Sequence, residues 1–588
     1  MNIIIFLLSC GGKTALLDTS DTGTVDTGET IDSGVDTADT STTTEEYTEA
    51  TYTPLEPVTA LNRVSMALRG MKPAPQEIVL VQNDPDQLYA LAEQYTQSSA
   101  FIETIGDMYA EILQMRSITL NLPERGALED QTRQDIRWAL GEEPINIVKE
   151  VVRTDLPFGT IVTADWSMLD NVSHKIWDNH TYNEVQGGLQ KVYFTDGRPA
   201  AGILVSNSFL IRHESNGSNY HRGRASIIAD KLLCSSFAGR DIPITGDVDL
   251  TDDDAVAEAV MNQAECVSCH QSVDPLAGHF WGTRDRLTPF QIGTAYNQGC
   301  DESLPNQFSC YPVPMYSSGY NDFWELLGLR EPNYWGSATT DLGDMGTQIS
   351  EDPRFSLCAA QKFTSYLTQV PEEELDFRLI AKYQQTFIDN NQNAKALALA
   401  IVTDPSFLAE RSEPEEAAAG LQVVRPEQLH RMILALTGFE VRWDIGASNN
   451  GVIPFFYDDT IGFRAMAGGI DGENVIFPTH TPTPIKLLSM AAYAEEAAGY
   501  VVDHDFSVPP PQRILFTSID DSQSDETAIR EELVSLHMKI YGVPLESTDD
   551  AIDDAYILWS QVQQDFGQIE AWKALLSAML QSPDILFY

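Results

Sequence analysis

The run Cys266-Val267-Ser268-Cys269-His270 constrains the fold of this chain more than any other feature. Its spacing is that of a c-type haem attachment site, because two thiols three residues apart on a helical turn can each add to one vinyl group of the same porphyrin. The histidine that follows then lies under the iron as proximal ligand. The run therefore predicts a helix that carries one covalent haem c at Cys266, Cys269 and His270.

Two other chemistries use the same residue types. A thiol redox motif would follow a strand in a βαβ unit, and no such pattern flanks this run. A zinc site needs a second pair of ligands at finger spacing, but a loop-like stretch separates the next two cysteines, Cys300 and Cys310. Thiol redox chemistry and zinc binding are therefore the weaker alternatives to haem iron.

The first residues form a short apolar run that ends in Leu7-Leu8-Ser9-Cys10. This pattern resembles a bacterial lipoprotein signal over residues 1–10, with Cys10 as the lipidated residue, and the run is too short to span a bilayer. No basic residue precedes the apolar core, so a frayed cytoplasmic N-terminus is the alternative. The pattern predicts export and a lipid anchor in the periplasm or on the cell surface.

Residues 11–55 are rich in Thr, Asp, Ser and Gly and poor in apolar side chains. Such a segment cannot offset the entropy of ordering, so we expect a disordered acidic tether. Calcium binding by the repeated Asp residues is the alternative, although their spacing does not match an EF-hand loop.

The seven cysteines can be divided among three uses. A lipid would take Cys10 and haem would take two, which leaves Cys234, Cys300, Cys310 and Cys358. An even remainder is consistent with two disulfides in an oxidising compartment, and three connectivities are possible. The preferred pairing is Cys234–Cys358 with Cys300–Cys310.

The charge of the chain limits its partners. Its 588 residues include 87 acidic and only 36 basic side chains, for a formal net charge of −51. Nucleic acid is an unfavourable partner because phosphate contacts need clustered Lys and Arg. A basic redox partner would be attracted, although a generally acidic, well-solvated surface explains the same composition.

Apolar stripes with helical spacing recur along the chain. One stripe includes Leu61 and Leu68 and ends at Gly70, and two similar stripes end at Gly438 and Gly542. Other apolar helices run into short polar breaks near residues 97–101, 403–407 and 581–585, as degenerate repeats of a packing unit would.

These patterns predict a mainly α fold, with several helical modules around a small cytochrome c-like domain and a minor mixed α/β region with β-prone runs at 191–194 and 203–205. The expected boundaries are 1–10 for the lipoprotein signal, 11–55 for the tether, 56–155 for an N-terminal helical module, 156–234 for the mixed region, 235–370 for the haem domain, 371–420 for a helical connector and 421–588 for a C-terminal helical module.

Several segments together resemble the planctomycete-type multi-domain cytochrome c proteins, whose flanking domains are mostly of unknown function. The similar segments are 164–170, 197–204, 222–234, 266–278, 355–358, 425–429 and 576–587. The resemblance implies a secreted, haem-bearing protein and supplies no substrate. The chain departs from the pattern at Ala277, where the family has a glycine.

The second axial ligand separates electron transfer from catalysis. Met315, in a stiff loop flanked by prolines, is the first candidate, and Met345 and His279 are its rivals. One interpretation of Pro275 is that its carbonyl, or a neighbouring one, accepts the Nδ1 proton of His270 and fixes its ring. The alternative is an ordinary turn proline.

The leading functional prediction is one-electron transfer through haem c. The alternatives are a haem oxidoreductase with an open axial position, and a surface lipoprotein whose helical modules bind a glycan or a protein partner. The group of His213-Glu214, His221, Arg222 and Arg224 could line a pocket or hold a haem propionate through an arginine. A solvated, charged helix start is the alternative interpretation.

Overall fold

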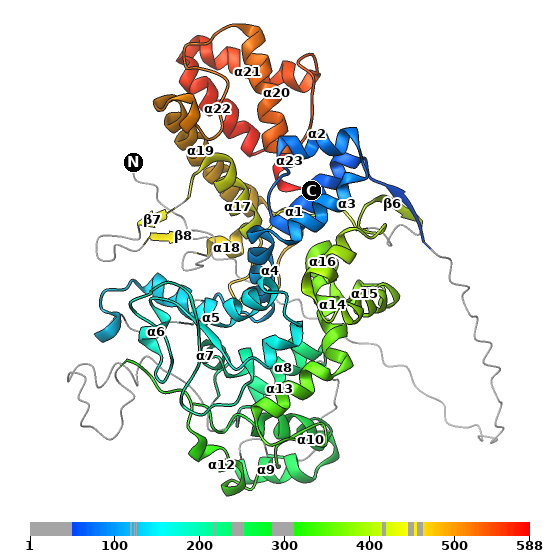
Figure 1. Ribbon diagram of the computed structural model, residues 1–588, viewed down its shortest axis with the longest axis vertical. Helices are drawn as coiled ribbons and strands as arrows, with labels where there is room; N and C mark the ends of the chain where they lie inside the picture. The colour runs from blue at the N-terminus through cyan, green and yellow to red at the C-terminus, as the bar shows by residue number, and fades with distance from the viewer. Residues whose placement is uncertain are drawn as a thin grey trace, which may run out of the picture. The chain divides into compact units, whose positions relative to one another are not determined.

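The structure is a computed structural model that describes residues 50–117, 120, 122, 124, 126–215, 219–237, 248–249, 252–284, 311–413, 419–440, 442–444, 452–454 and 462–588. Over these residues the fold is mainly helical, as the sequence predicts (Figure 1). Cys10, Cys300, Cys310 and nearly all of the expected tether lie outside the described residues.

The α-helices are α1 (Pro57–Arg69), α2 (Pro75–Asn83), α3 (Gln87–Thr96), α4 (Ser99–Ile112), α5 (Arg133–Arg153), α6 (Ser173–Ile176), α7 (Asn207–Arg212), α8 (Arg222–Leu233), α9 (Asp253–Asn262), α10 (Ala264–Gly278), α12 (Phe323–Leu326), α13 (Leu342–Glu351), α14 (Pro353–Thr368), α15 (Phe377–Asp389), α16 (Ala394–Val402), α17 (Pro426–Thr437), α18 (Phe463–Met466), α19 (Pro484–Ser507), α20 (Glu526–Tyr541), α21 (Asp550–Phe566), α22 (Gln568–Leu580) and α23 (Pro583–Leu586). The strands are β1 (Thr51–Pro54), β2 (Ser167–Leu169), β3 (Gln190–Val192), β4 (Asn333–Tyr334), β5 (Ser337–Ala338), β6 (Ala409–Glu413), β7 (Arg442–Asp444) and β8 (Val452–Pro454). They pair antiparallel as β1–β6, β2–β3, β4–β5 and β7–β8.

The three apolar stripes that end at glycine form the helices α1, α17 and α20, which confirms that prediction. Gly70, Gly438 and Gly542 close these helices in the left-handed conformation, with φ of 66°, 69° and 72°. At Gly70 the space is also closed, because an added Cβ would lie 2.7 Å from Nη2 of Arg431. A larger residue there would displace the arginine as well as strain the backbone.

The polar breaks between apolar helices are confirmed, and each supplies an acceptor for free backbone N–H groups. Between α3 and α4, Ser98 Oγ accepts a hydrogen bond from Phe101 N at 3.2 Å. After α16, Asp404 Oδ1 accepts from Ser406 N at 2.9 Å. After α22, Ser582 Oγ accepts from Asp584 N at 3.3 Å.

The region 156–234 contains short strands, as predicted, but one of its two β-prone runs is not a strand. Lys191 lies in β3, which pairs with β2, whereas residues 203–205 belong to the buried 3-10 helix η3 (Gly202–Val205). Gly202 has a φ of 51°, and an added Cβ would lie only 2.1 Å from the Ile161 carbonyl oxygen. The left-handed backbone at Gly202 turns the chain immediately before residues 203–205, so these residues cannot continue as an extended strand.

The predicted end of the tether at residue 55 is also wrong, because β1 begins at Thr51. Thr51 pairs with Glu413 and Thr53 with Arg411 of β6. A pairing with a strand so distant in sequence leaves no local periodic signal, and four residues are too few for a reliable alternation.

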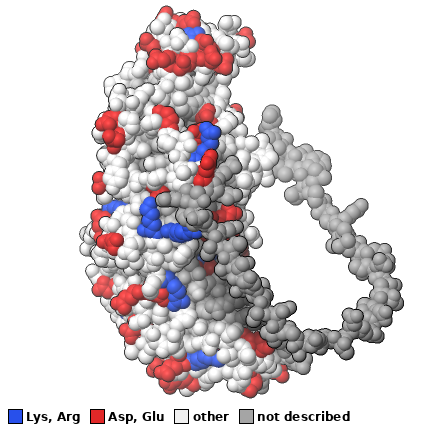
Figure 2. All heavy atoms as spheres, turned by 90° about the vertical axis from the view of Figure 1, so that its right-hand side faces the viewer, with Lys and Arg blue, Asp and Glu red and all other residues white. Residues whose placement is uncertain are grey.

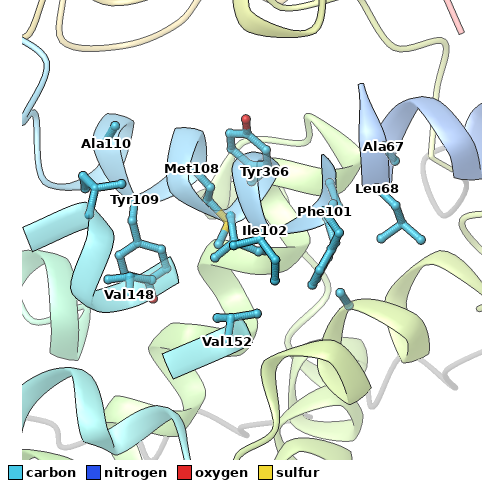
Figure 3. Packing of buried hydrophobic residues seen from close by; sticks show 14 of the residues in the cluster. Ala67, Leu68, Phe101, Ile102, Met108, Tyr109, Ala110, Val148, Val152 and Tyr366 are labelled. Carbon is cyan, nitrogen blue, oxygen red and sulfur yellow. The ribbon is translucent and has the colours of Figure 1, made fainter. Parts of the chain in front are cut away.

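The helix α4 contributes several side chains to the main hydrophobic cluster (Figure 3). Its Phe101, Ile102 and Tyr109 are buried and pack with Val148 and Val152 of α5 in one hydrophobic cluster. Each fully buried side chain of this size stabilises the fold by about 1.5–3 kcal/mol relative to exposure. The core therefore binds the N-terminal helices to the middle of the chain.

Buried charges also connect α4 to the C-terminal helices. Asp107 of α4 accepts a hydrogen bond from Arg116 at 2.6 Å and forms a second ion pair with Arg431 of α17. Arg116 also donates to Glu142 of α5 at 2.8 Å. The segments expected as separate N- and C-terminal modules therefore pack on each other, and residues 50–588 form one compact unit.

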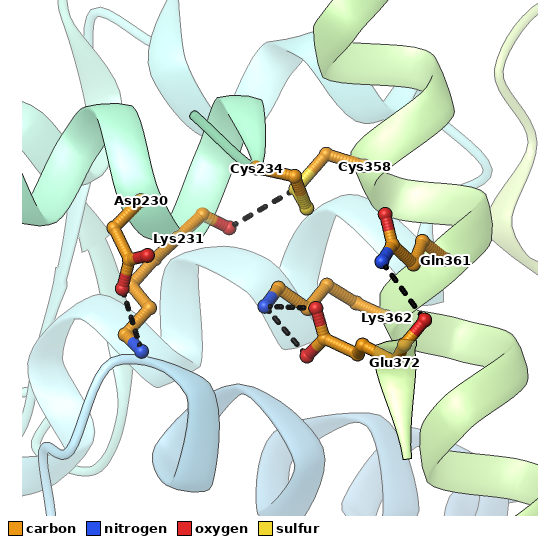
Figure 4. Close-up of a disulfide and its surroundings, with 7 residues drawn as sticks. All are labelled: Asp230, Lys231, Cys234, Cys358, Gln361, Lys362 and Glu372. Carbon is orange, nitrogen blue, oxygen red and sulfur yellow. Dashed lines mark hydrogen bonds and ion pairs between the residues drawn. A yellow bond between two sulfur atoms is a disulfide. The ribbon is translucent and has the colours of Figure 1, made fainter. Parts of the chain in front are cut away.

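A disulfide joins Cys234, which follows α8, to Cys358 of α14 (Figure 4). This is the pairing preferred from the sequence, and Cys358 is buried. The bond fastens α8, which precedes the Cys-x-x-Cys-His run in sequence, to α14, which follows it, across a sequence separation of 124 residues.

Replacing both bonded cysteines, as Cys234→Ser with Cys358→Ser, is expected to lower the free energy of unfolding by roughly 2–5 kcal/mol. The physical reason is that the unfolded chain gains the freedom of a long loop that the bond closes. Urea unfolding without reductant measures the change. An unchanged free energy of unfolding would show that this bond does not form in the folded protein.

Candidate functional site

The Cys-x-x-Cys-His run lies on a helix, as the sequence predicts, in α10. Cys266 and Cys269 are free thiols and are each partly exposed. Residues three apart on a helix share one face, and His270 follows on the same turn. The structure therefore presents the two thiols and the imidazole together, one helical turn from end to end.

Burial divides α10 into two halves. Residues 264–272, which include the motif, are exposed or partly exposed, whereas Val273 to Gly278 are buried. Strand β4 and the helices α8 and α9 pack against α10. The second half anchors the helix in the protein, and the first half presents the thiols and the imidazole.

Asp274 holds the ring of His270. The distance from His270 Nδ1 to Asp274 Oδ1 is 2.9 Å, so the expectation that the Pro275 carbonyl accepts this proton is wrong. Carbonyls in a helix point toward its C-terminus, away from a residue five positions earlier, while side chains four apart lie on the same face. Because a carboxylate can only accept, the Nδ1 of His270 carries the proton.

Two arginines hold the Asp274 carboxylate. Arg222 donates to it through Nε at 2.6 Å and through Nη2 at 3.3 Å, and Arg330 Nη1 lies 3.5 Å away. Burial alone would raise the pKa of Asp274, but the bonds from His270 and Arg222 outweigh it and lower this pKa below its usual value. Asp274 is therefore a buried anion that fixes three positive or donating groups.

Arg330 extends this arrangement to a third helix. Its Nη2 donates to the Val260 carbonyl of α9 at 3.2 Å, while Arg222 is the first residue of α8. Asp274 thus joins α8, α9 and α10 beneath the motif. The His270–Asp274 spacing of four residues could have indicated the first contact from sequence, but no local signal marks Arg330.

The group around Arg224 is packed inside the protein, which excludes one of its two sequence-based interpretations. Arg224 is fully buried and donates to Thr283 Oγ1 at 3.0 Å and to the His213 carbonyl at 2.9 Å. Burial and the charge of Arg224 lower the pKa of His221 to about 2. These residues fasten α8 to the segment after α10, and the solvated helix start is wrong because they are buried. Arg222 is bound to Asp274.

The three candidates for a second axial ligand are all buried. Met315 and Met345 belong to the main hydrophobic core, and the Met315 carbonyl accepts from the Arg284 N–H at 2.9 Å. His279 is bonded through both ring nitrogens, to a backbone carbonyl at 3.1 Å and to Thr339 Oγ1 at 2.6 Å. Met315 therefore lies beside the segment that follows α10, and Met345 lies in α13. Both ring nitrogens of His279 are engaged in hydrogen bonds.

Over the residues that the structure describes, no three His, Cys, Asp or Glu side chains converge as metal ligands do. None of the described helices is both long enough and apolar enough to cross a bilayer. The chain matches no protein-family model, no curated protein and no solved structure. The assignment of a function therefore depends on the chemistry of α10 and its surroundings.

Replacing Asp274 by Asn should reduce the free energy of unfolding by roughly 3–5 kcal/mol, because two largely buried guanidinium groups lose their anion. The matched control is Asp553→Asn, whose ion pair with Arg530 lies at 2.6 Å with the carboxylate 49 % exposed. That change should cost much less, because solvent screens an exposed ion pair. Urea denaturation compares the two, and equal losses would contradict the anchoring role of Asp274.

Proposed function

We propose that this chain carries one covalent haem c on α10 and transfers single electrons. The observation that supports this most strongly is the group of two free thiols one turn apart and a histidine that engages only Nδ1 with Asp274. Thioether bonds to Cys266 and Cys269 would hold the porphyrin, and His270 would offer Nε2 to the iron. The haem supplies the one-electron iron couple when bound.

The protein side chains adjust the properties of this site through Asp274. Its carboxylate fixes the tautomer and orientation of His270 and increases the basicity of the ring, which favours the more oxidised iron. Arg222 and Arg330 also bind this carboxylate, so its effect on the basicity of His270 is smaller than that of a carboxylate without cations beside it. A neutral carbonyl acceptor would withdraw the Nδ1 proton less strongly.

The second axial ligand decides between electron transfer and catalysis. We propose Met315 first, because its backbone is bonded to Arg284 in the segment that leaves α10, whereas Met345 lies in α13 and His279 is engaged through both ring nitrogens. A site without a sixth protein ligand is the alternative and would make the protein a haem oxidoreductase.

Location and partner form the last part of the proposal. We propose an exported lipoprotein anchored through Cys10, and the Cys234–Cys358 bond supports an oxidising compartment. Acidic side chains are spread over the face in Figure 2, where basic side chains form only a few patches. A basic redox partner is complementary to such a surface.

Expression in a host that matures c-type cytochromes is expected to give a c-type pyridine haemochrome spectrum on the denatured protein. The matched control is Cys266→Ala with Cys269→Ala, which removes both thioether positions and is expected to retain no haem after denaturation. Absence of haem from the unsubstituted protein would exclude the proposed electron transfer and direct attention to thiol or zinc chemistry at the motif.

Replacing Met315 by Leu should abolish the charge-transfer absorption of a methionine–iron bond, because Leu keeps the volume of the side chain and removes the sulfur. Met345→Leu is the matched control and should leave the band unchanged. Loss of the band in Met345→Leu alone would assign that residue instead. A haem-bearing protein with no such band would favour the oxidoreductase alternative.

A further inference from the structure

A hollow of about 450 Å³ lies away from α10, between α3, α15, α16 and the turn after α5. This volume is within the range of small-molecule sites, roughly 300–1,000 Å³. The hollow combines an apolar surface with a rim of hydrogen-bonding side chains.

The apolar part comes from α16 and from one tyrosine. Ala396, Leu399 and Ala400 line one side and are partly buried. Tyr89 of α3 also lines the hollow, and its side chain is 56 % exposed. An exposed aromatic ring beside small aliphatic side chains provides a flat apolar face at which a ring-shaped ligand can stack.

The polar part is centred on Lys395. Its ammonium lies 3.0 Å from Gln97 Oε1 and 3.0 Å from Asp155 Oδ1, and its side chain is only 9 % exposed. An ammonium has three N–H donors, so one remains for a ligand. The Gln97 amide accepts through its oxygen, which leaves its two N–H groups as further donors.

The rim also offers acceptors. Asn390 donates through Nδ2 to the Thr386 carbonyl at 2.8 Å, so its side-chain oxygen is available. Asp155 binds Lys395 and Asn393 through one carboxylate oxygen and presents the other. The same hollow is therefore lined by both donors and acceptors.

The backbone next to the hollow is held in an unusual conformation. Asp155, Asn391 and Gln392 have φ values of 54°, 55° and 54°, in the left-handed region that costs energy for residues other than glycine. Gln392 is locked there, because its backbone and side-chain oxygens accept from Phe158 N at 3.0 Å and Gly159 N at 2.9 Å. Gln392 does not itself line the hollow, but its bonds fix the backbone between the lining residues Asn390 and Asn393.

We propose that this hollow binds a pyranose ring of a neutral saccharide. A pyranose has an apolar face that can stack on Tyr89 and a ring of hydroxyls, each able to donate and accept, that suits a lining with both donors and acceptors. Lys395 neutralises the Asp155 carboxylate, and the negative charge of Glu93 remains. This remaining charge disfavours phosphate and other anions. This site does not depend on haem.

The test uses the full chain with four neutral disaccharides, namely maltose, cellobiose, xylobiose and diacetylchitobiose, in saturation-transfer NMR and calorimetric titration. At least one should bind with a Kd of about 10 mM or tighter. Tyr89→Ala should weaken that binding by about tenfold or more, whereas Tyr89→Phe, which keeps the ring, should stay within about threefold.

The matched control is Tyr193→Ala, a tyrosine of similar exposure at 46 % that does not line the hollow. It should bind as the unsubstituted protein does. Since Tyr89 is exposed, its replacement should leave thermal stability unchanged, which the same samples verify. The proposal is overturned if none of the four sugars binds or if Tyr89→Ala binds as tightly as the unsubstituted protein.

Discussion

One buried carboxylate, Asp107, connects the two ends of this fold. Its side chain is 2 % exposed and is shared by Arg116 and Arg431, and Glu142 balances the second positive charge. A buried group of this kind adds little net stability over apolar packing, but loss of one member leaves an uncompensated charge. The helices α4, α5 and α17 are therefore held in a single relative arrangement, and the hydrophobic core forms around it.

The same electrostatic pattern recurs beneath the motif. Asp274 is a second buried carboxylate shared by two arginines, and it differs from Asp107 in one respect, because its third contact is a histidine on the partly exposed half of α10. The charge group that holds three helices together also sets the chemistry of His270. A change in the packing of α8 or α9 would shift Asp274 and so change the orientation of the His270 ring, although the bond to that ring comes from Asp274 itself.

Local signals in the sequence predicted much of this structure. Apolar stripes that end at glycine predicted α1, α17 and α20, and the spacing of the motif predicted a helix at Cys266. The 3-10 helix at Gly202 was missed, because a close approach to the Ile161 carbonyl overrides the β propensity of the residues that follow.

Contacts between distant residues account for the remainder. Arg222 and Arg330 reach Asp274 from 52 and 56 residues away, and Lys395 meets Gln97 across 298 residues. No periodic pattern or short motif in the sequence marks any of these three contacts, so they become visible only in the folded chain. The Cys-x-x-Cys-His residues could be recognised because they are adjacent in sequence, whereas the two arginines that hold Asp274 could not.

The division of α10 into an anchored half and a presented half has a consequence for how the protein matures. Every buried residue of the helix lies after His270, so the turn with the two thiols can open locally while Val273 to Gly278 stay packed. Segments with few buried contacts open at far lower free energy than the core does. If haem c is attached to α10 as proposed, the attaching enzyme can act on a briefly extended stretch of a protein that is otherwise folded.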